Sequence, residues 1–369
     1  MINQENLIKI INFRKKMHEH PEVSNHEDNT RKLIKEFVSI NMPNYQLHDE
    51  NKWLYYTKDF KENRPTIVLR ADHDAIRNSS NIPFHGCGHD GHTAILLGVM
   101  LEEKDIEHDI NIIYLFQPAE ENGSGAPMCA PLFEKYKIDK VYGLHNMPNL
   151  DKNVIYYRNE TVMCASVGYR ISLKGIQSHA SEPEKGLNPV YVLSKFASSI
   201  EPLAKNCAFK PFTFKGHHFS SLAMITIVNM TVGSLNFGIS PANGEISLTL
   251  RAAKEKELSI LEEYVVNYFK ALKGKFEVKI EEFDRFDENY ADPNLVKETL
   301  NKLKDCGLTI KELAEPIRAS EDFGFYKKFA PCMFFFVGMG KCPSLHHDDY
   351  QFDDDIIPVA IDLFKEIIK

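Results

Sequence analysis

The segment TIVLRADHDAIRNSSNIPFHGCGHDGHTAILLGVMLEEK, residues 66–104, carries the pattern from which the fold follows. Its start, TIVLRADHDA, is typical of a buried parallel strand with polar groups at its carboxyl end. Its last part, TAILLGVMLEEK, predicts a helix buried on one face. The runs INIIYLF, from Ile110, and VYGLH, ending at His145, are two further strands, with a helix expected between them at 126–136. We therefore expect an α/β domain with a mostly parallel sheet covered by helices on both faces.

Between this first strand and its helix lies HGCGHDGH, residues 85–92, which combines one thiol, one carboxylate and three imidazoles. Cys87 and His89 flank a single glycine, so both side chains can reach one ion. A thiolate and an imidazole favour a divalent metal such as zinc over magnesium or calcium. A single His or Cys is usually structural, but this density is unusual by chance, so the segment predicts a metal site.

Further candidate groups follow the strands, where ligands bind in open α/β sheets. Asp74 follows the first strand and is expected to orient a metal-binding imidazole or to touch the metal itself. Glu120 and Glu121 follow the second strand. Adjacent carboxylates repel each other, so the pair makes sense if one binds a cation and the other handles protons. The alternative is a solvated acidic loop. His145 ends the third strand.

Histidines at both ends of the chain are also candidates. His18 and His20 lie at the end of a helix expected over residues 4–20, and a structural role there is the favoured interpretation. Near the other end, LHHDDYQF follows the apolar strand CMFFFVG. One of His346 and His347 can therefore rejoin the site.

The pattern changes after about residue 166. Strands and helices then follow in the order βαββαβ, which predicts a four-stranded antiparallel sheet with two helices on one face. We expect this inserted α+β satellite domain at 167–284, and a catalytic metal-binding domain made of 1–166 and 285–369. The length of 369 residues agrees with two domains, because single cores rarely grow so large.

Composition restricts the classes of partner. The formal net charge of -8 argues against nucleic acid as the main partner, since phosphate binding needs a basic surface. No stretch is typical of a membrane segment, and the charged N-terminal sequence MINQENLIKIINFRKK does not resemble a signal peptide. Seven scattered cysteines favour reduced thiols over a disulfide framework. We therefore expect a cytoplasmic protein.

Several motifs together resemble a known family. RADHDA, HGCGHDGHTA, FQPAEE, GLH, KGIQSHASEP, SEDF and LHHDDYQF occur in the order found in the two-metal amidohydrolases related to aminoacylase and carboxypeptidase. The chain is most similar to the subgroup of hippurate hydrolase, N-acetyldiaminopimelate deacetylase and the plant auxin-conjugate hydrolases. The similarity spans essentially the whole chain.

The resemblance implies a set of site residues. In the subgroup, two divalent ions are held by a Cys and a His of CGHDGH, the second Glu of the pair, the His of GLH and the first His of the late motif. The matching positions are Cys87, His89, Glu121, His145 and His346. The first Glu of the pair is the family's general base and matches Glu120. A satellite-domain His that polarises the scissile carbonyl, often in the partner subunit, matches His179. The thiolate favours zinc, and manganese or cobalt are alternatives.

The chain also departs from the family pattern. The family usually reads RADMDALPI and has a longer loop before the Cys motif, whereas this chain has RADHDAIRNSSNIPF. Gly86 replaces a common alanine. Asn236 lies in a loosened version of a family stretch. Asn236 and Arg251 could grip a substrate carboxylate, and a structural role for either is an equal alternative.

Together these features predict a metal-dependent amidohydrolase that cleaves the amide bond of N-acyl amino acids. A metal-activated water would attack the carbonyl, Glu120 would take its proton, and His179 would stabilise the oxyanion. The resemblance also implies a homodimer formed through the satellite domain. A dipeptidase or carboxypeptidase with the same site is one alternative, and a non-catalytic binding module is another. The altered loop before Cys87 is the feature that favours the latter.

Overall fold

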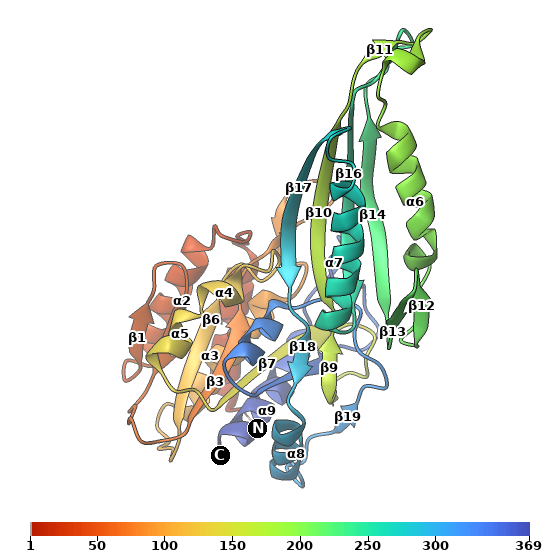
Figure 1. Cartoon of the computed structure of the whole chain (residues 1–369). Helices are drawn as coiled ribbons and strands as arrows, with labels where there is room; N and C mark the ends of the chain where they lie inside the picture. Colours follow the sequence, from red (N-terminus) through yellow and green to blue (C-terminus); the bar gives the residue numbers. More distant parts are fainter. Residues whose placement is uncertain (1) are drawn as a thin grey trace. The chain divides into compact units, whose positions relative to one another are not determined.

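The computed structural model describes residues 2–369 (Figure 1). Its internal contacts divide the chain into two compact units. The first runs to Val162 and also contains Asn289–Glu315 and Glu321–Lys369. The second consists of Met163–Glu288 and Pro316–Ser320. The predicted satellite range, 167–284, falls inside the second unit.

The first unit is built on an eight-stranded sheet with the order β1, β2, β6, β3, β7, β20, β8, β19. The strands are β1 (Gln46–Asp49), β2 (Leu54–Thr57), β3 (Thr66–Asp72), β6 (Asn111–Gln117), β7 (Lys140–Met147), β8 (Ile155–Tyr157), β19 (Ile310–Glu312) and β20 (Cys332–Gly338). The central strands β6, β3, β7 and β20 are parallel. All side chains of β3, β6 and β20 are buried, as expected for parallel strands covered on both faces. The predicted fold class is confirmed.

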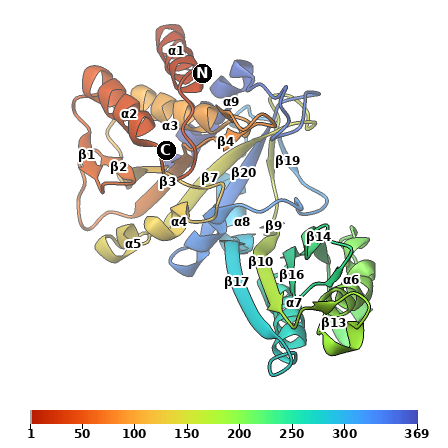
Figure 2. The ribbon, with the colours of Figure 1, turned by 90° about the horizontal axis from the view of Figure 1, so that it is seen from above.

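Helices cover this sheet on both faces (Figure 2). They are α1 (Gln4–His18), α2 (Asp28–Asn41), α3 (His89–Glu103), α4 (Gly125–Met128), α5 (Pro131–Lys135), α8 (Pro293–Lys302) and α9 (Ile357–Ile368). Helix α3 packs against β3 on one side and against α1 and α9 on the other, so nearly all of its residues are buried. α8 begins with Pro293, and the carboxylate of Asp292 accepts the N–H groups of Asn294 and Leu295.

One predicted helix of this unit is wrong in its extent. Residues 126–136 form two short helices, α4 and α5, rather than one. Pro131 has no N–H to bond the carbonyl of Pro127, so the first helix ends and a second begins at the proline.

The second unit contains a four-stranded antiparallel sheet with the order β14, β16, β10, β17. Its strands are β10 (Ala165–Lys174), β14 (Ala223–Val232), β16 (Asn243–Ala252) and β17 (Glu277–Phe286), and its helices are α6 (Val190–Ala204) and α7 (Glu255–Lys270). Along β10 and β16 buried and half-buried residues alternate. The apolar faces of both helices pack on the buried set in one core.

Short elements complete both units. They are β4 (Ile76–Arg77), β5 (Pro83–Phe84), β9 (Glu160–Met163), β11 (Ser178–His179), β12 (Phe212–Phe214), β13 (His217–Phe219), β15 (Ile239–Ser240), β18 (Asn289–Ala291) and the 3₁₀ helices η1 (Pro183–Lys185), η2 (Asp322–Lys328) and η3 (Asp354–Ile356). Among residues 2–369, no helix has the length and apolarity needed to span a bilayer.

Candidate metal centre

The predicted ligands are brought together at one edge of the eight-stranded sheet. Asp74 follows β3, Glu120 and Glu121 follow β6, His145 lies in β7, and α3 begins at His89. Since β3, β6 and β7 run parallel, their carboxyl ends lie on the same side. Residues far apart in the sequence therefore share one site.

Gly88 makes the turn into α3. Its φ of +91° lies in the left-handed region, which favours glycine. A Cβ atom here would lie 2.3 Å from Oδ1 of Asn146 and 2.6 Å from the hydroxyl oxygen of Tyr350. Glycine is therefore required between Cys87 and His89, and this tight turn places both side chains at the site.

The five predicted ligands form two groups of three that share Cys87. One group contains Cys87, His89 and His145, and the other contains Cys87, Glu121 and His346; within each, the candidate ligand atoms lie within 4.8 Å of one another. The sulfur of Cys87 is 3.4 Å from Nε2 of His145. Nε2 of His346 is 3.4 Å from Oε2 of Glu121. The geometry therefore offers two adjacent sites with one common thiol.

Hydrogen bonds at Nδ1 orient both buried imidazoles. Nδ1 of His89 lies 3.0 Å from Oδ1 of Asp74, and Nδ1 of His145 lies 2.6 Å from the backbone oxygen of Asn146. Each Nε2 is thereby directed to the shared site, as in metal sites whose ligands are held by outer partners. The other oxygen of Asp74 accepts from Oγ of Ser24 and from the N–H of Glu121.

Two buried polar atoms that lack hydrogen bonds support a cation at this site. Within residues 2–369, Nε2 of His89 and Oε1 of Glu121 are buried without a hydrogen bond, which is costly for polar atoms. Burial, followed by Glu121 and Glu120, raises the pKa of the Cys87 thiol well above its ordinary value. Burial lowers the pKa of His89, but Asp72 and Asp74 outweigh it and raise that pKa to about 10. Thiolate, imidazole and carboxylate donors in such negative surroundings suit a zinc-like divalent ion.

Glu120 belongs to neither of these two groups, and it forms a further group of possible ligands with His89 and Glu121. Its carboxyl group is buried, and Oε1 accepts the N–H of Asp322 at 3.3 Å. Burial, followed by the charges of Glu321 and Glu121, raises the pKa of Glu120 well above its ordinary value. A carboxyl group with a raised pKa can both accept and return a proton near neutral pH.

The turn before the Glu pair is strained and held from another segment. Ala119 has a φ of +50°, which is unfavourable for a residue with a Cβ. Its N–H donates to Oε1 of the buried Glu27 at 2.8 Å. Burial, followed by the charge of Asp74, raises the pKa of Glu27 to about 7. Glu27 therefore stabilises the backbone that presents Glu120, a role that our sequence analysis missed.

A buried arginine also escaped the sequence analysis. Arg70 in β3 donates to Gln117, Asp72, Glu321 and Asp322. It thereby ties η2, from the late SEDF motif, to the strands that carry the site. The sequence could have indicated this network, because an arginine inside the apolar run TIVLRAD is expected to be buried. A buried cation needs anionic partners.

The cluster HGCGHDGH does not act as one unit. His92 bonds Asp72 through Nδ1 and Asn146 through Nε2, both at 2.6 Å, so its nitrogens are already engaged. Asp90 instead forms ion pairs with His18 and Arg14 of helix α1. The structural interpretation of His18 agrees with this contact. Of the two late histidines, His346 belongs to a ligand group and His347 does not.

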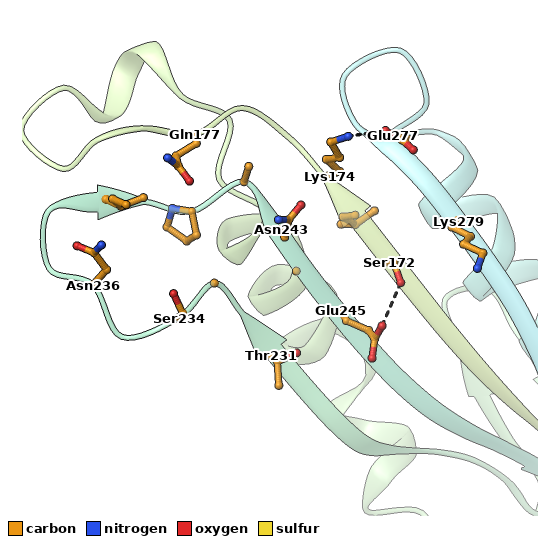
Figure 3. Close-up of a pocket in the computed structure, with 16 residues that line it drawn as sticks. Ser172, Lys174, Gln177, Thr231, Ser234, Asn236, Asn243, Glu245, Glu277 and Lys279 are labelled. Carbon is orange, nitrogen blue, oxygen red and sulfur yellow. Dashed lines mark hydrogen bonds and ion pairs between the residues drawn. The ribbon is translucent and has the colours of Figure 1, made fainter.

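The predicted substrate and oxyanion residues lie in the second unit. His179 is exposed in β11. Asn236 is exposed and lines a hollow of about 630 Å³ beside β10, β14, β16 and β17 (Figure 3). Nη1 of Arg251 donates to the backbone oxygen of Arg318 at 2.7 Å and to Oγ of Ser320. These contacts favour a structural role for Arg251.

Comparison with known proteins decides the family. The sequence profile of peptidase family M20/M25/M40 matches residues 68–369. The chain belongs to this family. An uncharacterized hydrolase of Staphylococcus saprophyticus is 29% identical, with 98% of this chain and 96% of the relative covered. M20/M25/M40 membership makes the chain a metal-dependent hydrolase of the peptidase and amidohydrolase type.

Solved structures share the M20 fold. A dinuclear metal binding peptidase of family M20 from Bacillus subtilis superposes with a TM-score of 0.78 at 21% identity, covering 99% of this chain and 98% of that one. The aminobenzoyl-glutamate utilization protein of Klebsiella pneumoniae gives a TM-score of 0.73 at 16% identity, covering 98% and 95%. At these identities the likeness shows the fold.

Proposed function

We propose that the protein hydrolyses the amide bond of N-acyl amino acids, releasing a carboxylic acid and a free amino acid. The observation that carries this proposal is the placement of Glu120, a buried carboxyl group with a raised pKa beside two adjacent donor groups. The name of one structural neighbour supports the substrate class, because aminobenzoyl-glutamate is itself an N-acyl amino acid.

The five side chains Cys87, His89, Glu121, His145 and His346 are proposed to hold two divalent ions, with zinc favoured by the thiol. Such ions would supply Lewis-acid chemistry, lowering the pKa of a water molecule and polarising a carbonyl. Glu120 would accept the proton of the attacking water and deliver it to the departing amine. Asp74 would keep His89 oriented throughout.

We propose that His179 stabilises the oxyanion. The N–H of Ser181 donates to its Nδ1 at 3.1 Å, and Oγ of Ser181 lies 2.7 Å from the same atom. Because Nδ1 accepts the amide hydrogen, the neutral ring carries its proton on Nε2. This tautomer is the one that can donate to an oxyanion.

We also propose a homodimer formed through the second unit. Strand β14 is an edge strand, and edge strands can pair with another chain. It exposes Val228 and Met230, and the following loop exposes Leu235 and Phe237 almost fully. Clustered apolar side chains of this kind are typical of interaction surfaces.

The test is hydrolysis of a panel of N-acetyl and N-benzoyl amino acids alongside free dipeptides, with and without added zinc, manganese or cobalt. We expect metal-dependent release of the amino acid from the acylated substrates. Preferential cleavage of dipeptides would favour a peptidase instead. Metal binding without cleavage of any panel member would contradict the proposed reaction.

A further inference from the structure

The short segment before Cys87 forms a hairpin. β4 (Ile76–Arg77) and β5 (Pro83–Phe84) pair antiparallel. Oδ1 of Asn78 accepts the N–H groups of Ser80 and Ile82 and closes the turn. The loop that is shortened relative to the family pattern is therefore an ordered element here.

This hairpin packs directly on Gly86. A Cβ atom at Gly86 would lie 2.3 Å from Cζ of Phe84 and 2.8 Å from Cδ1 of Ile76. Both distances are below 3.0 Å, so a side chain at this position would force the Phe84 ring and the end of Ile76 to move. Gly86 and the hairpin are thus two parts of one packing arrangement.

The same hairpin contacts the loop that carries His346. The backbone N–H of Ser79 donates to Oδ1 of Asp348 at 3.0 Å, and Oγ of Ser79 donates to Oδ2. Two residues after the hairpin, the carbonyl oxygen of Gly86 accepts the N–H of His346 at 2.8 Å. One contact therefore holds the backbone of His346 itself, and the other holds Asp348, two residues later.

His346 needs such support. Its side chain is 53% exposed, so burial does not fix it in place. Its φ of +66° lies in the left-handed region, which residues with a Cβ adopt only when their surroundings enforce it. His346 is the proposed ligand that lies in the exposed loop contacted by the hairpin.

We propose that the hairpin Ile76–Phe84 is a positioning brace that holds His346 against Cys87 and Glu121, with Ser79 as its key residue. The brace acts on the Cys87, Glu121 and His346 group and leaves the group of Cys87, His89 and His145 intact. Ser79 touches no proposed ligand and works through Asp348. This inference rests on the proposed ligand set.

The test measures zinc affinity by competition with a chromophoric chelator. In the Ser79→Ala variant we expect one of two bound zinc ions to be held more weakly, by up to about 10-fold, the lower end of the loss seen when direct outer partners of metal ligands are removed, while the other keeps its affinity. Ser80→Ala is the matched control, because Ser80 is exposed on the same turn and contacts Asn78 through its backbone. Ser79→Thr keeps the hydroxyl and should restore the affinity.

A double-mutant comparison assigns the weakened ion. Removing Ser79 in a His346→Ala background should add no further loss, since the two residues act on the same site. Full additivity of the two losses in zinc affinity would contradict the proposed role of the hairpin. A Ser79→Ala variant that binds both zinc ions as tightly as wild type would contradict it too. A wild-type chain that binds fewer than two zinc ions would instead count against the proposed ligand set.

A second variant tests the packing half of the brace. Gly86→Ala should weaken the same ion because the new Cβ pushes Phe84 away. The double change Gly86→Ala with Phe84→Ala should recover part of the affinity. Equal zinc affinity in Gly86→Ala and wild type would contradict the packing argument.

Discussion

The sulfur of Cys87 lies 3.4 Å from Nε2 of His145 and also belongs to the group formed with Glu121 and His346. One thiol is thus common to both candidate sites. The loss of this thiol should therefore affect the binding of both metal ions, whereas the loss of a ligand from one group should affect one ion.

Replacing Cys87 by Ala should weaken both metal ions, whereas His145→Ala and His346→Ala should each weaken one. The reason is that each histidine belongs to a single group of three. Zinc titration of the three variants, followed by elemental analysis, measures this difference. A Cys87→Ala protein that still binds two ions at wild-type affinity would show that the thiol is not shared.

The Glu120→Gln variant should lose about 10²- to 10⁴-fold in kcat, the usual contribution of a general base, while keeping its metal content. The amide can still accept the N–H of Asp322 but cannot take up a proton. Steady-state kinetics and elemental analysis on the same sample separate the two effects. The exposed Glu315→Gln is the control. Wild-type turnover in Glu120→Gln would remove Glu120 from the reaction.

The His179→Ala variant should lose about 100-fold or more in kcat, as expected for removal of an oxyanion donor. Ser181→Ala should cause a smaller loss, because it removes the Oγ contact to Nδ1 of His179 but keeps the backbone N–H that fixes the tautomer with hydrogen on Nε2. Zinc affinity should stay unchanged in both. Ser178→Ala is the control on the same short strand. A large loss of zinc affinity in His179→Ala would instead make His179 a ligand.

The contribution of Glu27 to the stability of the metal-free protein should fall as the pH rises through about 7. The pKa of Glu27 is about 7 in the fold and 4.5 ordinarily, so folding favours its protonated form. The stabilisation is complete below pH 4.5 and is lost progressively as the pH rises through 7, by roughly 3 kcal/mol at about 1.4 kcal/mol per unit.

Urea unfolding of wild type and Glu27→Gln, with chelator present, tests this contribution at pH 5 and pH 8. The variant keeps an uncharged group at every pH, so the difference between the two proteins should change in its favour at pH 8. An identical pH dependence in both proteins would show that Glu27 does not titrate as described.

The sequence alone predicted the parts of the structure for which residue chemistry and hydrophobic periodicity indicate the same arrangement. The all-apolar strands predicted the parallel sheet, and their carboxyl ends predicted the meeting of Glu121 and His145. The order βαββαβ predicted the antiparallel sheet of the second unit. The extent of the helix at 126–136 was wrong because Pro131 interrupts the hydrogen bonding.

Other features depended on contacts that no local pattern encodes. The partners of Arg70 come from β3, β6 and η2, more than 200 positions apart at the extreme. The residue pattern left His346 and His347 open, and the family resemblance selected His346, whose backbone N–H bonds to Gly86. The explanation of Gly86 itself needed the position of the Phe84 ring. Residue type suggested the candidates, and tertiary contacts selected among them.

The most direct test of the central claim is a titration of zinc into the metal-free protein while hydrolysis of an N-acyl amino acid is followed. We expect no activity without metal and a rise that requires two equivalents per chain for completion, because the five ligands form two groups. Full activity without metal, or a plateau after one equivalent, would contradict the two-site account.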